Sequence, residues 1–149
     1  MAKQLPARAR VVIIGGGIVG CSVAYHLTKR GVEDVVLLER KQLACGTTWH
    51  AAGLIGQLRA THNLTRLAQY TAELYTGLED ETGQATGFKQ NGSMVIAGNA
   101  ERFEELKRGA SMARCFGLEV EVIDAQEARA RYPLLNIDDV VGAVFLPKD

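Results

Sequence analysis

Cysteine, net charge and long apolar runs are all scarce in this sequence, and each shortage excludes a class of protein. The 149 residues contain three cysteines, which are widely spaced and form no C-x-x-C pair. This favours reduced thiols over a disulfide framework, and no spacing of histidine, cysteine and acidic residues suggests a metal site. Lysine plus arginine number 17, as do aspartate plus glutamate, so no net field favours a nucleic acid or an anionic membrane as partner. No apolar run approaches the roughly 20 residues of a membrane-spanning helix.

The first residues of the chain carry basic side chains but lack the apolar stretch of a secretory signal. They are also short for a mitochondrial presequence. We therefore expect a cytoplasmic location.

The most informative segment begins at Val11 and ends at Glu39. It predicts an apolar strand, a glycine turn, a helix over residues 18–30 and a second apolar strand that ends in an acid. Gly15 allows the chain to turn sharply off the strand, Gly17 lets backbone approach a pyrophosphate, and Gly20 lets the helix pack closely on the sheet. The free N–H groups at the helix start face the phosphates, and the Glu39 carboxylate can accept the ribose hydroxyls. All parts fall at the offsets that a dinucleotide site requires.

The rest of the chain predicts mixed helices and strands. We expect a helix over residues 64–82 with Asn63 as N-cap and a core stripe formed by Leu64, Leu67, Thr71, Leu74 and Leu78. Gln90-Asn91-Gly92-Ser93 predicts a hairpin between strands at residues 87–90 and 93–97. Asp124 and Glu127 predict a capping box for a short helix that Pro133 ends. We also expect a helix over residues 100–116 and strands over residues 119–123 and 140–146.

A dinucleotide-binding sheet needs more than two parallel strands, and no further strand–helix–strand unit follows Glu39. We therefore expect an α/β chain that is a fragment of a longer protein, with the remaining strands of the sheet beyond residue 149. The alternative is a small self-contained α+β protein.

The residues after Arg40 distinguish between dinucleotides. The run K-Q-L-A-C-G-T-T-W-H-A-A-G-L is rich in small residues that let backbone lie against a flat ring system. The carboxylate of Glu39 disfavours the 2′-phosphate of NADP. The sequence therefore favours FAD, with a nicotinamide-dependent dehydrogenase as the alternative.

The segment G-T-T-W-H-A-A-G-L, from Gly46 to Leu54, resembles the flavin loop of the sarcosine and dimethylglycine dehydrogenases, which are D-amino-acid-oxidase-like flavoproteins. Further segments that fit this resemblance are L-E-D-E-T-G, Q-N-G-S, Y-P-L-L-N and the terminal L-P-K-D. The resemblance covers nearly the whole chain from Val11 onward. It implies an α/β fold, the N-terminal part of an FAD-binding Rossmann-like domain plus the start of a mixed-sheet substrate lobe. Residues 1–60 would form the first half of the FAD-binding domain and residues 61–149 the beginning of the substrate lobe, with the remainder of both beyond residue 149.

The resemblance implies specific roles for the residues of this chain. His50 occupies the position of the histidine that is bonded covalently to the 8α carbon of FAD, whereas without the motif it would be interpreted as a hydrogen-bonding loop residue. Ile18 and Val19 would offer N–H groups to the pyrophosphate, and Arg40 would lie beside the adenine. The predicted FAD-binding residues are Gly15, Gly17, Ile18, Val19, Gly20, Glu39, Arg40, Gly46, Thr47, Thr48, Trp49, His50, Ala51, Ala52, Gly53 and Leu54.

The resemblance also implies a reaction. We expect oxidative N-demethylation of sarcosine or dimethylglycine, with hydride transfer to the flavin and electrons leaving to an electron-transferring flavoprotein or to oxygen. Tetrahydrofolate would be handled by a C-terminal region outside these residues, and no catalytic residue can be assigned within them. The alternatives are another FAD-dependent amine or amino-acid oxidoreductase of the same superfamily, or a truncated remnant without catalysis.

Overall fold

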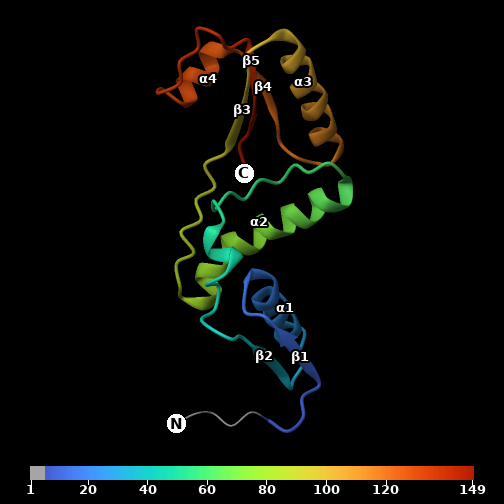
Figure 1. The fold of residues 1–149 in the computed structure, drawn as a ribbon. Helices are drawn as coiled ribbons and strands as arrows, with labels where there is room; N and C mark the ends of the chain where they lie inside the picture. The colour runs from blue at the N-terminus through green and yellow to red at the C-terminus, as the bar shows by residue number, and fades with distance from the viewer. Residues whose placement is uncertain (1–5) are drawn as a thin grey trace. The chain divides into compact units, whose positions relative to one another are not determined.

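The computed structural model describes residues 6–149. The chain forms two compact units, one that ends at Leu54 and one that runs from Ile55 to Asp149 (Figure 1). Both contain helices and strands, so the predicted α/β class is confirmed. The assignment of residues 1–60 to an FAD-binding domain and 61–149 to a substrate lobe stays a prediction. No helix among residues 6–149 is long and apolar enough to cross a membrane.

The first unit consists of a strand, a helix, a second strand and a short 3-10 helix. The elements are β1 (Val11–Ile14), α1 (Ile18–Lys29), β2 (Val35–Leu38) and the 3-10 helix Thr47–His50. β1 and β2 are parallel neighbours, with Val11 opposite Val35 and Ile14 opposite Leu38. The helix and the second strand confirm the sequence prediction to within one residue.

One face of this two-stranded sheet is left open, because a single helix can cover only one side. Ile14 is 88% exposed and Val12 51% exposed, while the neighbouring residues of β1 are half-buried. No residue of β2 is fully buried. The apolar side chains of Val19 and Val23 on α1 are exposed as well.

The second unit begins with the long helix α2 (His62–Thr82), whose N-cap is Thr61 rather than the predicted Asn63. The Thr61 hydroxyl oxygen accepts a hydrogen bond from the backbone N–H of Leu64 at 3.3 Å. The buried residues of α2 are Thr65 and Ala72, two helical turns apart. The predicted core stripe is therefore wrong at its first two positions, because Leu64 is 51% exposed and Leu67 is 62% exposed.

Thr65 is buried at the start of α2, and its side chain binds the backbone of Arg59 in the loop before the helix. Its hydroxyl accepts a hydrogen bond from the backbone N–H of Arg59 at 3.1 Å and donates one to the Arg59 carbonyl at 3.3 Å. A fully buried hydroxyl needs such partners, since an unpaired one would destabilise the fold.

A three-stranded antiparallel sheet forms the centre of the second unit. Its strands are β3 (Ser93–Ala97), β4 (Glu121–Ile123) and β5 (Gly142–Leu146), in the order β3-β5-β4. The predicted hairpin at residues 90–93 is wrong, because β3 pairs with β5 and residues 87–90 form no strand. The Gly92 N–H instead donates to the carbonyl of Asp149 at 3.0 Å, which fixes the end of the chain beside β3.

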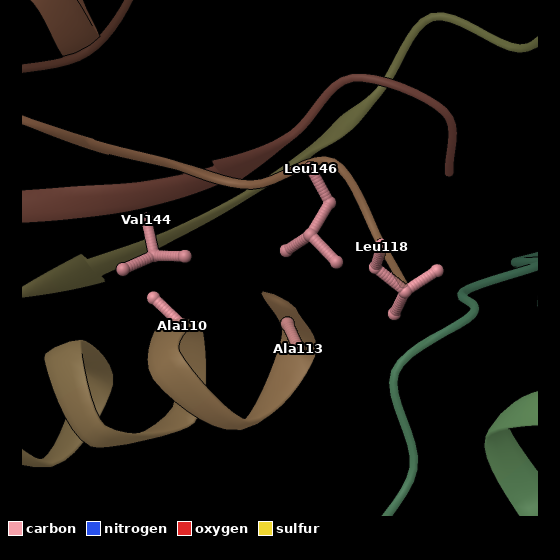
Figure 2. Close-up of a cluster of buried hydrophobic side chains, with 5 residues drawn as sticks. All are labelled: Ala110, Ala113, Leu118, Val144 and Leu146. Atoms are coloured by element: carbon pink, nitrogen blue, oxygen red, sulfur yellow. The ribbon is translucent and has the colours of Figure 1, made fainter. Parts of the chain in front are cut away.

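Helices α3 (Ala100–Cys115) and α4 (Ala125–Arg131) pack on opposite faces of this sheet (Figure 1). Val144 and Leu146 face α3, where they form a cluster with Ala110, Ala113 and Leu118 (Figure 2). Ala143 points the other way, to Ala128 of α4. The alternation of β5 side chains thus joins both helices to one sheet.

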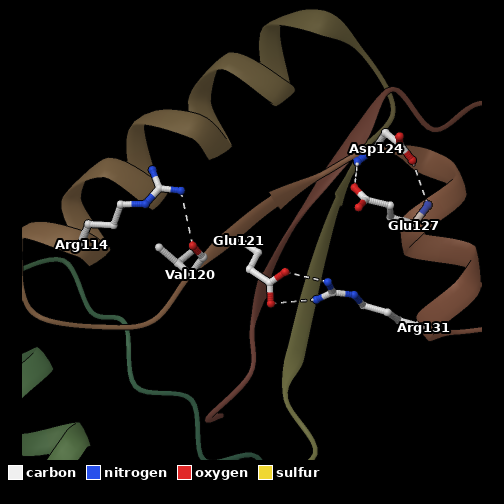
Figure 3. Close-up of polar contacts among 6 residues, drawn as sticks. All are labelled: Arg114, Val120, Glu121, Asp124, Glu127 and Arg131. Atoms are coloured by element: carbon white, nitrogen blue, oxygen red, sulfur yellow. Dashed lines mark hydrogen bonds and ion pairs between the residues drawn. The ribbon is translucent and has the colours of Figure 1, made fainter.

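Polar contacts fix α4 at both ends (Figure 3). The predicted capping box is confirmed: the Asp124 carboxylate accepts from the Glu127 N–H at 2.8 Å, and the Glu127 carboxylate accepts from the Asp124 N–H at 3.2 Å. At the other end, the two terminal guanidinium nitrogens of Arg131 donate to the Glu121 carboxylate, at 2.6 and 3.1 Å. These donors hold the pKa of the Glu121 carboxyl below its ordinary value.

Candidate functional site

The glycine turn of the first unit has the geometry that a dinucleotide-binding turn requires. Gly15 adopts a φ of +106°, which L side chains rarely adopt. A Cβ on Gly20 would lie 1.9 Å from the carbonyl oxygen of Gly15, so α1 approaches the turn more closely than any side chain permits. Both glycines have the conformational or packing role that the sequence predicted.

The N-terminus of α1 contacts the loop that follows β2. Gly17 is the N-cap and provides no side-chain cap, and no acidic residue lies in the first turn. The Ile18 N–H donates instead to the hydroxyl oxygen of Thr48 at 2.9 Å. A Cβ on Gly17 would lie 3.1 Å from the same oxygen. Thr48 therefore closes the helix start, and Gly17 leaves room for it.

Glu39 follows β2 directly and is held by backbone donors. Its carboxylate oxygens accept hydrogen bonds from the N–H of Gly16 at 2.8 Å and of Lys41 at 2.9 Å. These two contacts, together with the charge of Arg40, hold the pKa of the Glu39 carboxyl below its ordinary value of 4.5. The carboxylate is thus ionised and oriented at the carboxyl end of the strand.

Gly16 is a site residue that sequence reasoning missed. A Cβ there would lie 2.5 Å from the Leu43 side chain and 3.0 Å from the Cβ of Glu39. Its N–H orients Glu39 and its carbonyl accepts from the Ala44 N–H at 2.8 Å. In the sequence it is the middle glycine of G-G-G. The dinucleotide-binding pattern specifies only the first and third of these glycines, Gly15 and Gly17, so it assigns no role to Gly16.

The loop resembling a flavin loop forms a tight turn around one carbonyl. The oxygen of Gly46 accepts a hydrogen bond from the Trp49 N–H at 3.1 Å and lies 3.0 Å from Nδ1 of His50. Both side chains are exposed, with Trp49 at 76%. The residues that follow are exposed as well, and Gly53 has a φ of +73°.

The structure thus brings some predicted site residues together and leaves others apart. Thr48 meets the helix start at Ile18, and Glu39 meets the glycine turn at Gly16. Val19 and Arg40 lie exposed at the surface. The predicted FAD contacts of all these residues stay predictions.

No group of three or more histidine, cysteine or acidic residues in residues 6–149 could hold a metal ion. The second unit contains a cavity of about 950 Å³ beside α2, and none of the predicted site residues lines it.

The parallel strand–glycine turn–helix–strand unit, with an oriented carboxylate after the second strand, defines the class of dinucleotide-binding Rossmann-like domains. The family of FAD-dependent oxidoreductases known as DAO matches residues 10–149, so the chain belongs to that family. This decides between the cofactors that the sequence left open, in favour of FAD.

Individual relatives support the same assignment. Mitochondrial sarcosine dehydrogenase of Mus musculus is 45% identical over 149 residues, which are 99% of this chain and 16% of the relative. Mitochondrial dimethylglycine dehydrogenase of Rattus norvegicus is 43% identical over 95% of the chain and 17% of its own length. The mitochondrial pyruvate dehydrogenase phosphatase regulatory subunit of Mus musculus is 44% identical over 97% of the chain and 16% of its own length. The predicted resemblance to sarcosine and dimethylglycine dehydrogenases is confirmed, and the chain spans about a sixth of the length of these relatives.

Among solved structures, the L-proline dehydrogenase of P. horikoshii superposes with a TM-score of 0.90 at 32% identity, over 97% of this chain and 38% of that one. Glycine oxidase of Bacillus cereus gives a TM-score of 0.81 at 30% identity, over 95% of this chain and 39% of that one. The predicted fold, that of an FAD-binding oxidoreductase, is confirmed, and the chain covers about two fifths of each of these structures.

Proposed function

We propose that this chain is the cofactor-binding N-terminal part of an enzyme that removes an N-methyl group oxidatively from sarcosine or dimethylglycine. The observation that carries the proposal is the similarity to enzymes of these names along nearly the whole chain, together with a glycine turn and carboxylate built for a dinucleotide. A 4-methylaminobutanoate oxidase of Paenarthrobacter nicotinovorans, 39% identical over 97% of the chain, also acts on a methylamino compound by its name. The substrate would therefore be a small secondary or tertiary N-methyl amine with a carboxylate.

The residues of the first unit fit the phosphate and adenosine part of FAD. Gly20 lets α1 pack directly against the glycine turn, because a Cβ there would lie 1.9 Å from the Gly15 carbonyl oxygen, and a helix that starts at such a turn is a typical pyrophosphate site. The Thr48 hydroxyl accepts from Ile18 and so keeps its own O–H to donate to a phosphate oxygen. The Glu39 carboxylate has remaining lone pairs for the ribose hydroxyls.

The bound flavin supplies the two-electron chemistry, and the protein supplies position and electrostatics. We propose that His50 is bonded to the 8α carbon of FAD. The imidazole is exposed and is held by the Gly46 carbonyl, so a ring nitrogen is accessible from outside the loop. Covalent attachment would keep the flavin in place during turnover.

The proposal extends to the partners and the location of the protein. We propose an electron-transferring flavoprotein as acceptor, with oxygen as the alternative, and tetrahydrofolate as a possible one-carbon acceptor in a region outside this chain. The cytoplasmic location remains a proposal, and several relatives bear names that place them in mitochondria.

A second function is favoured by one observation. The phosphatase regulatory subunit is about as similar to this chain as the dehydrogenases are, so identity alone does not decide whether the protein catalyses a reaction. The alternative is a flavin-binding subunit without amine oxidation.

Anaerobic reduction of the flavin tests between these functions. The full protein, loaded with FAD, is mixed with sarcosine, dimethylglycine or 4-methylaminobutanoate, and the absorbance near 450 nm is followed. We expect bleaching by one of the N-methylglycines, with formaldehyde as product. Bound flavin that none of the three amines bleaches would contradict the enzyme and support the regulatory alternative.

A further inference from the structure

Asp149, three residues after β5, joins separate segments of the second unit. Its carboxylate oxygen Oδ1 accepts a hydrogen bond from the backbone N–H of Gln57 at 2.8 Å. Its other oxygen, Oδ2, accepts one from the Ser93 hydroxyl at 2.5 Å, and its carbonyl accepts the Gly92 N–H at 3.0 Å. One residue thus holds the loop before α2 against the start of β3.

The neighbouring Lys148 holds the same loop through a second contact. Its carbonyl oxygen accepts hydrogen bonds from the side-chain amides of Gln57 and Gln90, the latter at 2.6 Å. Gln57 therefore donates from its backbone to Asp149 and from its side chain to Lys148. It is 7% exposed, and a buried amide needs such partners. Both the backbone and the side chain of Gln57 are fixed.

Gln57 follows the predicted FAD-binding segment closely along the chain. That segment ends at Leu54, its residues 51–54 are exposed, and Gln57 is the first buried residue after it. Three residues of chain span at most about 11 Å, so a fixed Gln57 limits the positions that Leu54 can adopt. The Thr65 hydroxyl binds the N–H and the carbonyl of Arg59, which fixes the backbone again two residues later.

We infer that Asp149 is a positioning residue of the proposed flavin enzyme, which fixes the Gln57 backbone and thereby the end of the predicted FAD-binding segment. This role rests on the proposed function, and it adds a residue that acts across 92 positions of sequence through the backbone of another. Both donors to the carboxylate are neutral groups, an N–H and an O–H. The reach of the side chain, rather than its charge, is therefore what places Gln57.

Two substitutions of Asp149 separate reach from charge. Asp149→Asn keeps the reach, because its oxygen can accept the Gln57 N–H and its amide can donate to the Ser93 hydroxyl oxygen. Asp149→Glu keeps the charge but is longer by one methylene group, so its oxygens and the loop cannot both stay in place.

Anaerobic reduction of the flavin by sarcosine or dimethylglycine measures the consequence in the full protein loaded with FAD. We expect the rate in Asp149→Asn to stay within about twofold of wild type, and the rate in Asp149→Glu to fall about tenfold or more, because a displacement of about 1 Å near a reacting group is costly. A normal rate in Asp149→Glu, or a slow rate in Asp149→Asn, would overturn the inference.

Ser93→Ala is the matched control for a general loss of structure. It removes the other donor to the same carboxylate and leaves the contact to Gln57 in place. We expect lower stability in urea and a rate of flavin reduction within about twofold of wild type. A rate that falls as far in Ser93→Ala as in Asp149→Glu would show a structural role only and overturn the inference.

Hydrogen exchange of the Gln57 amide in the flavin-free full protein tests the contact without any reaction. We expect exchange about tenfold or more faster in Asp149→Glu and unchanged in Asp149→Asn and Ser93→Ala. Unchanged exchange in Asp149→Glu would overturn the inference. If no amine bleaches the wild-type flavin, the proposed enzyme fails, whereas faster exchange and weaker FAD binding in Asp149→Glu would still support Asp149 as a positioning residue for the cofactor.

Discussion

The closest approach in the dinucleotide turn offers a strong test of the site, through Gly20→Ala. The added Cβ would lie 1.9 Å from the Gly15 carbonyl oxygen and 3.3 Å from the Ile13 side chain. Real Cβ atoms essentially never lie under 3.0 Å from another heavy atom, so α1 or the turn must move by about 1 Å. Overpacking of this kind costs about 1–3 kcal/mol, which exceeds the roughly 1 kcal/mol that alanine gains over glycine in a helix.

The displaced helix would also carry its N–H groups away from the phosphates. We expect Gly20→Ala to lower the FAD affinity of the flavin-free full protein by about tenfold or more, measured by calorimetry, and to lower its stability in urea. Gly77→Ala is the matched control, because Gly77 is an exposed glycine within α2 whose Cβ would meet nothing within 4 Å. The control is expected to gain about 0.5–1 kcal/mol and to leave FAD affinity unchanged. Unchanged affinity and stability in Gly20→Ala would refute the reasoning about the turn.

Substitutions of Thr48, Glu39 and Leu146 should also change stability or FAD binding. Thr48→Val removes the acceptor for the Ile18 N–H, and we expect the flavin-free protein to lose about 1 kcal/mol in urea unfolding, whereas Thr47→Val should be near neutral. Glu39→Gln should weaken FAD binding about tenfold, since the amide offers one acceptor oxygen where the carboxylate offers two; equal binding would remove Glu39 from the site. Because the pKa of the Glu39 carboxyl is lowered, the stability that the ionised group contributes is fully present above pH 4.5 and is lost as the pH falls through the lowered pKa. The difference in urea stability between wild type and Glu39→Gln should therefore be constant from neutral pH to about pH 5. Leu146→Ala truncates a residue packed on α3 and should destabilise by about 2–5 kcal/mol, and a loss below 1 kcal/mol would show that this cluster is not a core.

Features that depend on neighbouring residues were predictable from the sequence. The turn at Gly15 and the close approach at Gly20 follow from the spacing of glycines between an apolar strand and a helix. The capping box of Asp124 and Glu127 spans three residues and is confirmed. Each of these is a local geometry that the chain can form with few contacts elsewhere, which is why the pattern sufficed.

Features that depend on distant residues were not predictable. Asn91-Gly92 has the composition of a hairpin turn, yet Ser93 pairs with Leu146, a partner that no local pattern identifies. The buried face of α2 is set by Thr65 and its bonds to Arg59, and apolar periodicity alone favoured Leu64 instead. In the candidate site, the roles of Gly16 and Thr48 arise from contacts across 23 and 30 residues of sequence.

The account depends on FAD being bound by this chain and attached at His50. The most direct measurement is the mass of the proteolytic peptide that contains His50, from the full protein produced with riboflavin and from His50→Ala beside it. We expect the wild-type peptide to carry the mass of FAD, and the variant to bind FAD that denaturation releases. An unmodified His50 peptide from the wild-type protein would contradict the attachment, and wild-type protein without any flavin would contradict FAD binding as well.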